Sequence, residues 1–386
     1  MRDGHGRMLT RRAALVGIEC AALAGVFWPR YARAAGQFKI GAIASLSGPA
    51  AAFSKDWAEG FAAYAKDWTA RGGYQGNGIS METLDDETKQ VSAINAFRKL
   101  AADPEVRVVW IALASQTALA IKAISDEFKV PVISGGGVDS LGKPASPWFF
   151  KVAPGGSDYV KAVAQFAKRK GFKTVGGLHG TDAIGQADKK WLVEFCEAEG
   201  LKVVAQESFA TSDTNFNAQL TNVRKAKPDI IYNGATGNSA ILMYKQIKQL
   251  GIGTPMFLSQ AAISRAFFEG IGGAGEAEGI YSVISVGALA DSVGGDTTRI
   301  YGELTKALGR QPVLFHTFGW DTGIITEWAA QHSDGTRKGL RDALDTAKGV
   351  PAINGVFNFT PDNHIGQDTR GVVVARLQTG KFVKAD

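Results

Sequence analysis

The histidines of this 386-residue chain are the residues best suited to hold a metal, but their spacing does not favour a metal site. Beyond residue 34 they are His179, His316, His332 and His364, which are far apart in the sequence. Zinc sites usually draw on closely spaced ligands, as in the HExxH and paired CxxC motifs, and neither motif occurs here. The sequence therefore predicts a protein without a metal centre.

Motifs for nucleotide binding and for nucleophilic catalysis are missing as well. Gly270, Gly272 and Gly275 match GxGxxG, but they follow a helical pattern rather than a strand, so they predict a loop. Neither the phosphate-binding motif GxxxxGK followed by Ser or Thr nor the nucleophile motif GxSxG occurs. We therefore expect no cofactor and no enzymatic activity, and an exported α/β hydrolase is only a remote alternative.

A short polar segment is the strongest candidate for ligand binding. Ser115, Gln116 and Thr117 join the end of an apolar run to the start of a predicted helix. The N–H groups of a first helical turn have no partner within the helix, so together with the two hydroxyls they suit an anion without Lys or Arg. The same hydroxyls could merely cap the helix, and both roles are compatible. Opposite them, Gly136 and Gly137 would let a ligand approach the backbone closely, or form only a flexible turn.

The elements that position these loops alternate between β-rich runs and amphipathic helical stretches, which is typical of parallel sheets with crossover helices. The first eight predicted strands are Phe38–Ser45, Ile79–Leu84, Arg107–Leu113, Pro131–Ser134, Thr174–Leu178, Leu201–Gln206, Ile230–Asn233 and Met256–Leu258. Between them, Trp57, Phe61, Tyr64 and Trp68 recur at helical spacing and predict a buried helix face.

Residues 135–156 are rich in Gly and Pro and too irregular for an ordinary connection, so they predict a break between two doubly wound α/β lobes. Later elements must complete lobes already begun. They are a strand at Ile280–Val286, helices at Thr297–Leu308, Asp321–His332 and Thr336–Ala347, and strands at Gly355–Phe359 and Val372–Leu377. We expect an N-terminal lobe of residues 36–156 plus 286–354 and a C-terminal lobe of residues 157–285 plus 355–386.

The first 34 residues predict export. A basic stretch ending in Arg11 and Arg12 precedes an apolar run and an A-x-A cleavage pattern that ends at Ala34. This indicates a signal peptide, of the twin-arginine or the general secretory kind, that is removed near Ala34 in the periplasm. The apolar run is 16 residues long and contains Glu19, so it falls short of the roughly 20 residues of a membrane anchor.

The net charge argues against nucleic acid as a partner. Of the formal charge of +6, most arises in residues 1–34, which hold six arginines and two acidic residues, so the remainder carries only +2. Such a small excess makes no basic stripe. Cys196 is the only cysteine after the predicted cleavage site, which predicts a chain without an internal disulfide.

Several segments, taken in order along the sequence, match the sequence pattern of a known protein family. They are Gly41–Pro49 with Phe53, Leu84–Asp86, the Ser115 loop, Val130–Gly136, Pro228–Tyr232, Gly275–Gly279 and Phe318–Asp321. With these segments the chain resembles the type I periplasmic binding proteins of ABC importers, in the branched-chain amino-acid binding protein family. The resemblance implies two lobes joined by a three-strand hinge, which close on one small solute and deliver it to an inner-membrane permease.

The resemblance also places residues that differ from the family pattern. Gln260 stands where amino-acid binders have an acidic partner for the ligand ammonium, and a neutral amide suits a hydroxyl, keto or carboxylate oxygen instead. Val138 replaces a hydroxyl, Ile184 replaces a Tyr, and an aromatic residue near Thr236 is missing. These changes leave apolar space beside Phe53, which would suit a planar aromatic carboxylate.

We therefore predict a periplasmic binding protein that captures a small organic acid, most plausibly an aromatic one, acts as a monomer and performs no reaction. A branched-chain amino acid or a small amide is the alternative solute, and a sensory role without transport stays open. The predicted ligand-binding residues are Phe53, Ser115, Gln116, Thr117, Gly136, Gly137, Val138, Ile184, Thr236 and Gln260.

Overall fold

The first sheet is built from apolar and β-branched runs of the N-terminal part of the chain. The computed structural model describes residues 37–112, 114–367 and 369–385. Five parallel strands pair in the order β2-β1-β3-β4-β5. They are β1 (Phe38–Ala44), β2 (Ile79–Asp85), β3 (Val106–Ala112), β4 (Val132–Ser134) and β5 (Phe149–Lys151). The connecting helices are α1 (Ala51–Ala70), α2 (Gln90–Ala102) and α3 (Ser115–Phe128).

The second sheet has seven strands in the order β14-β13-β10-β9-β8-β6-β7. The parallel strands are β6 (Thr174–Gly180), β7 (Lys202–Phe209), β8 (Ile230–Asn233), β9 (Met256–Leu258) and β10 (Tyr281–Ser285). At one end of the sheet, β13 (Val372–Gln378) pairs antiparallel with β10, and β14 (Lys381–Lys384) pairs antiparallel with β13 to form the edge. The helices of this part are α4 (Gly156–Arg169), α5 (Ala183–Ala198), α6 (Asn217–Lys225), α7 (Gly237–Gln249) and α8 (Arg265–Ile271). The predicted α/β class with two parallel-sheet lobes is confirmed.

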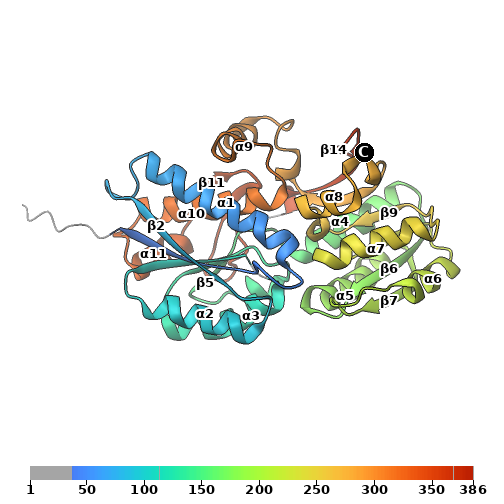
Figure 1. Ribbon diagram of the computed structural model, residues 1–386, viewed down its shortest axis with the longest axis horizontal. Coiled ribbons are helices and arrows are strands. Elements are labelled where there is room, and N and C mark those ends of the chain that lie inside the picture. The colour runs from blue at the N-terminus through green and yellow to red at the C-terminus, as the bar shows by residue number, and fades with distance from the viewer. Residues whose placement is uncertain (1–36, 113, 368, 386) are drawn as a thin grey trace, which may run out of the picture. The chain divides into compact units, whose positions relative to one another are not determined.

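The chain passes between the two sheets three times (Figure 1). It enters the second lobe after β5 and returns to the first lobe after β10. There it forms three helices, α9 (Gly295–Leu308), α10 (Leu314–Gln331) and α11 (Arg337–Asp345). The hairpin of β11 (Lys348–Ala352) and β12 (Gly355–Asn358) follows, and the chain re-enters the second sheet at β13.

One predicted lobe boundary, at residue 355, does not fit the packing. Phe357 and Phe359 belong to the same hydrophobic core as β1, β3 and α10. The backbone N–H of Lys151 in β5 donates to the carbonyl of His364 (2.8 Å), and Ile365 forms a bridge with Lys151. Residues 355–366 therefore lie with the first lobe, because an isolated strand pattern does not say which sheet it joins.

The closest helix contact in the first lobe joins α1 to α10. Trp57 and Phe61 of α1 are buried there, as their spacing predicted. Gly60 and Gly319 allow the two backbones to touch, because a Cβ at Gly60 would overlap with the carbonyl oxygen of His316 and a Cβ at Gly319 with that of Trp57. The sequence pattern predicted that α10 starts at residue 321, which is seven residues too late. The reason is that α10 is buried on nearly all sides and therefore shows no amphipathic period.

The predicted signal peptide and its cleavage site lie outside the residues that the structure describes. Within residues 37–385, Cys196 is a free, buried cysteine of α5, and its burial raises the pKa of the thiol to about 12. None of the described helices is both long and apolar enough to cross a membrane.

Candidate ligand-binding site

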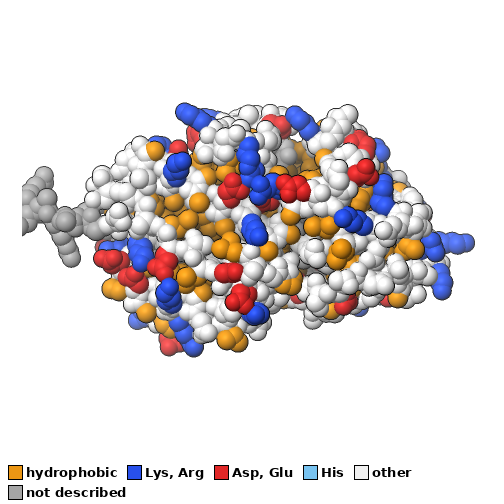
Figure 2. Space-filling model, in the orientation of Figure 1, with side chains coloured by type: hydrophobic (Ala, Val, Ile, Leu, Met, Phe, Trp, Pro, Cys, Tyr) orange, Lys and Arg blue, Asp and Glu red, His pale blue; other side chains and the backbone are white. Residues whose placement is uncertain are grey.

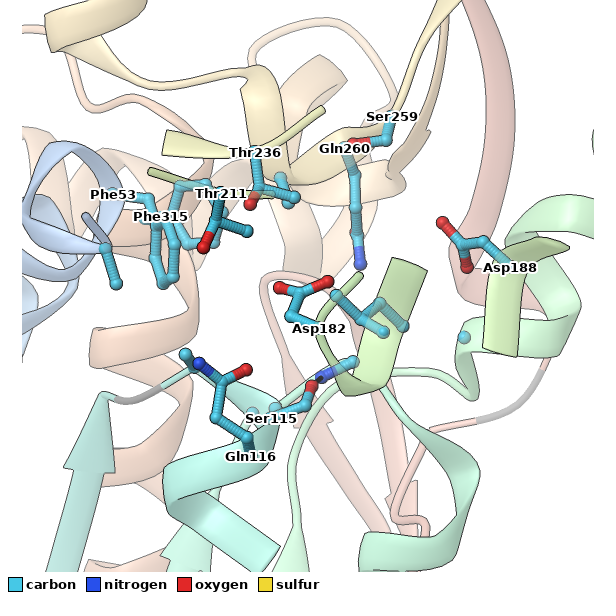
Figure 3. A pocket seen from close by; sticks show the side chains of 18 of the residues that line it. Phe53, Ser115, Gln116, Asp182, Asp188, Thr211, Thr236, Ser259, Gln260 and Phe315 are labelled. Carbon is cyan, nitrogen blue, oxygen red and sulfur yellow. Dashed lines mark hydrogen bonds between the residues drawn. The ribbon is translucent and has the colours of Figure 1, made fainter. Parts of the chain in front are cut away.

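A cavity of about 90 Å³ lies between the carboxyl ends of strands from both sheets. The first lobe contributes the start of α1, the loop from β3 into α3 and the glycine loop after β4. The second lobe contributes the starts of α4, α5 and α7 and the segment after β9 (Figure 3). Open α/β sheets bind their ligands at this edge, because loops rather than strands meet there. The volume suits one small solute.

The structure brings eight of the ten predicted residues together around this cavity. They are Phe53, Ser115, Gln116, Gly136, Gly137, Ile184, Thr236 and Gln260. That these residues contact a ligand stays a prediction.

Thr117 and Val138 do not line the cavity, which corrects two of the predicted positions. The Thr117 hydroxyl donates to the carbonyl of Ala114 (2.8 Å), and its side chain is fully buried. Val138 packs into the core cluster that contains Ile111 and Leu141. Thr117 was placed from its hydroxyl at a predicted helix start and Val138 from the family pattern, but neither fixes the direction in which a side chain points.

The start of α3 has the features of an anion site. No side chain caps the helix at Ala114. The N–H of Thr117 donates to the carbonyl of Ala114 (3.1 Å), which leaves the N–H groups of Ser115 and Gln116 as the ones that could bind a ligand. Ser115 is only 5% exposed, and its Oγ accepts a hydrogen bond from the N–H of Gly137 (3.1 Å). A hydroxyl that accepts one bond keeps its proton, so Ser115 can still donate to a carboxylate in the cavity.

An aromatic wall, defined as Phe53, Trp57, Phe315 and Phe318, closes the side of the cavity formed by α1 and α10. The ring centroids of Phe53 and Phe315 are 5.2 Å apart, and those of Trp57 and Phe318 are 5.9 Å apart. All four side chains are less than 10% exposed. A further planar ring beside this wall would extend the aromatic packing.

The opposite wall, from the second lobe, is polar and carries two carboxyl groups. Asp182 caps α5 by accepting from the N–H of Gly185 (3.0 Å), and Asp188 accepts from the hydroxyl of Tyr232 (2.7 Å). Burial raises the pKa of both groups, and that of Asp188 reaches about 7. In Figure 3 the Asp182 carboxylate lies between Gln260 and Ser115. Neither Lys nor Arg occurs among the described residues that line the cavity.

Several lining residues were not predicted. Trp57 was assigned to the core alone, whereas it also faces the cavity. Asp182 could have been noticed, because it stands at the junction of a strand and a helix, as the Ser115 segment does. Asp188 lies within α5, away from such a junction. Tyr159 of α4 could not have been noticed, because its approach to the cavity depends on the packing of both lobes.

The lobes touch on both sides of the cavity. On one side α3 packs against α5, and a Cβ at Gly137 would come within 2.9 Å of Ile184 Cδ1. On the other side α1 packs against α7 and α8. There the Asp56 carboxylate of α1 accepts from the backbone N–H of Arg265, the first residue of α8 (3.0 Å). Acidic and basic side chains lie next to each other over the region between α1 and α8 (Figure 2).

Asp56 also belongs to the one described group of residues whose geometry could hold a metal ion, with Glu59 and His316. Two arginines already neutralise this group: Arg265 pairs with Asp56 (3.4 Å) and Arg310 with Glu59 (2.6 Å). The backbone N–H of residue 313 donates to His316 Nδ1 (3.0 Å), and burial lowers the pKa of the imidazole. The arrangement is an ion-pair network rather than an open cation site.

Comparison with known proteins identifies the family. A family model described as periplasmic binding protein matches residues 37–381. A leucine-, isoleucine-, valine-, threonine- and alanine-binding protein of Pseudomonas aeruginosa is 23% identical over 60% of this chain, and the match spans 62% of that relative, less than two thirds of its length.

Solved structures share the fold over nearly the whole chain. An extracellular ligand-binding receptor from Rhodopseudomonas palustris HaA2 has a TM-score of 0.83 at 23% identity, over 90% of this chain and 99% of that one. A solute-binding protein of an ABC transporter from R. palustris, in complex with benzoate, has a TM-score of 0.79 at 21% identity, over 90% and 95% of the chains. These likenesses confirm the type I periplasmic binding fold, and with the matching family model they show that the chain belongs to the periplasmic binding protein family.

Proposed function

We propose that this protein is the solute-binding component of an ABC importer of the branched-chain amino-acid class, and that its solute is a small carboxylate with an aromatic group. The observation that carries the proposal is the aromatic wall, which stands beside an uncapped helix start in a cavity lined by neither Lys nor Arg. The carboxylate would bind the first turn of α3 and Ser115, and the ring would lie against Phe53.

Binding in this proposal needs no chemical reaction. The solute enters while the lobes are apart and contacts both lobes once they close. Closure hides the solute from water and forms a surface shared by the two lobes, which an inner-membrane permease would recognise. The protein would act in the periplasm as a monomer, after removal of residues 1–34. The benzoate complex of the R. palustris neighbour supports an aromatic carboxylate as a ligand of this fold.

An amino acid is a second candidate solute, and one observation favours it. Asp182 and Asp188 line the cavity and offer carboxylate oxygens to an ammonium group, although Gln260 stands at the family's usual acidic position. The amino-acid-binding relative of P. aeruginosa supports the same candidate.

A thermal-shift screen of residues 35–386 tests these candidates. We expect benzoate, cinnamate or phenylpyruvate to raise the melting temperature, because a ligand at about 100 times its Kd stabilises the folded state by about 2.7 kcal/mol, a shift of several degrees. Leucine, valine and phenylalanine serve as the comparison set. Stabilisation by the amino acids alone would refute the aromatic acid and assign the ammonium to the two aspartates.

Ser115→Ala is expected to weaken binding of the carboxylate about 5- to 30-fold, or about 1–2 kcal/mol, because one hydrogen bond to a charged group is lost. Calorimetric titration measures the change. Thr117→Val is the matched control, since it removes a nearby hydroxyl that bonds to Ala114 and not to the cavity. Equal affinities of the wild type and Ser115→Ala would show that the carboxylate binds elsewhere.

A further inference from the structure

Four buried polar atoms of the cavity wall have no hydrogen-bond partner among the described residues. Trp57 Nε1 and Gln116 Oε1 belong to the first lobe, and the Tyr159 hydroxyl and Gln260 Oε1 belong to the second. A buried polar group without a partner costs about 1–3 kcal/mol, and native proteins rarely leave such groups together. The concentration of four in one cavity indicates that a ligand supplies their partners, and that it presents polar groups to both lobes.

We propose that Tyr159 and Gln260 form a second polar subsite that binds a neutral hydroxyl group of the solute, at the end away from its carboxylate. The inference rests on the proposed function and narrows it, since the solute would be a hydroxy-substituted aromatic acid. Tyr159 is 3% exposed, and the side chains of Gln260 and Ser285 lie close enough to its hydroxyl to lower its pKa, although neither makes a well-formed hydrogen bond to it. Nothing in the established family membership assigns this pair.

The two side chains offer complementary hydrogen-bonding groups. Burial raises the pKa of Tyr159, so its hydroxyl keeps its proton and can donate, whereas Gln260 Oε1 accepts. A hydroxyl group accepts and donates at once, so it can satisfy both. A keto oxygen cannot donate to Gln260, and an ammonium group has no lone pair to accept from Tyr159. A second carboxylate would place another negative charge beside Asp182 and Asp188 of the same wall.

The place of the subsite fits a ring that carries two polar substituents. In Figure 3, Gln260 reaches into the cavity from the side opposite Ser115 and Gln116. A ring with a carboxylate and a hydroxyl on different carbons would span the cavity and contact both lobes.

The test compares solutes that differ by a single hydroxyl group. Calorimetry with benzoate, 3-hydroxybenzoate and 4-hydroxybenzoate should show one hydroxy isomer binding at least about tenfold more tightly than benzoate, the gain of roughly one buried hydrogen bond. In Tyr159→Phe and Gln260→Leu this ratio should fall to within about twofold. Thr117→Val is the control, because its hydroxyl bonds to the Ala114 carbonyl outside the cavity lining, so the variant should leave the ratio unchanged.

Each failure has a distinct meaning. Equal binding of benzoate and both hydroxy acids to the wild type overturns the subsite and leaves the proposed function intact. A ratio that persists in both variants, with melting curves showing that they fold, also overturns it. If all three acids fail to bind while leucine or phenylalanine binds, the proposed ligand class is wrong, and the subsite assignment is refuted with it.

Discussion

Gly319→Ala is expected to destabilise the protein by about 1–3 kcal/mol, although alanine is the better helix former by about 1 kcal/mol. The added Cβ would overlap with the carbonyl oxygen of Trp57 and lie 2.8 Å from Gly60 Cα and from the backbone nitrogen of Phe61. These are backbone atoms of α1, which cannot move aside as a flexible side chain can, so α1 and α10 must separate. Urea denaturation measures the loss in the free energy of unfolding.

Gly302→Ala is the matched control, because Gly302 lies within α9, is exposed, and has no atom within 4 Å of the added Cβ. The same substitution should there stabilise the protein by up to about 1 kcal/mol. Opposite signs of the change in stability at the two positions would locate the effect in the helix contact.

Solute affinity should also fall in Gly319→Ala, because Phe53 and Trp57 of α1 and Phe315 and Phe318 of α10 form the aromatic wall. A Gly319→Ala protein as stable as the wild type would show that the contact can relax.

The sequence predicted best what depends on local patterns. Strands such as β1 and β3 are apolar runs between turns, and the α/β alternation determined the class of fold. The strand β5 was missed, because its three residues lie in a Gly- and Pro-rich segment without a recognisable period. The start of α10 was missed for a different reason, since burial on nearly all sides removes the amphipathic signal.

In the candidate site too, local patterns predicted some residues correctly and others not. Ser115 and Gly137 lie in loops whose position follows from the order of strand and helix, and they hydrogen-bond to each other. Thr117 was placed from its hydroxyl at a predicted helix start and Val138 from the family pattern, and neither fixes the direction of a side chain. Tyr159 reaches the cavity only because two lobes come together, and no local pattern encodes that contact. Trp57 was assigned to the core alone, because helical spacing does not separate a buried side chain that also lines a cavity from the rest of the core.

Asp56→Asn is expected to weaken the binding of every solute by about 1.5–3 kcal/mol, roughly 10- to 150-fold, because it removes a charged acceptor that joins the two lobes. Asp56 is only 2% exposed, and its carboxylate accepts from the backbone N–H of Arg265. Asp56 belongs to the first lobe, whereas α8 is anchored in the core of the second lobe through Phe267. Separating the lobes must break this bond, so it stabilises only the closed form.

An equal loss of affinity for every solute would distinguish an effect on lobe closure from an effect on ligand contacts. In the proposed function a solute binds tightly only to the closed form, so a change in the closed population would alter all affinities by one factor. Tyr159→Phe should instead alter the ratio between the hydroxy acids and benzoate, because Tyr159 is proposed to bind only the hydroxyl group of the solute. Dissociation rates from stopped-flow measurements on two different solutes, with Kd from calorimetry, separate the two patterns.

Arg265→Ala provides the control for Asp56→Asn. Its side chain is 45% exposed and lies 3.4 Å from the Asp56 carboxylate, so the ion pair itself is worth at most about 1 kcal/mol. The backbone N–H that makes the main bond remains after the substitution. Arg265→Ala should therefore weaken binding less than about fivefold. If it matched Asp56→Asn, the exposed ion pair would hold the lobes together. If Asp56→Asn changed the affinity for only one solute, Asp56 would act on the ligand and not on closure.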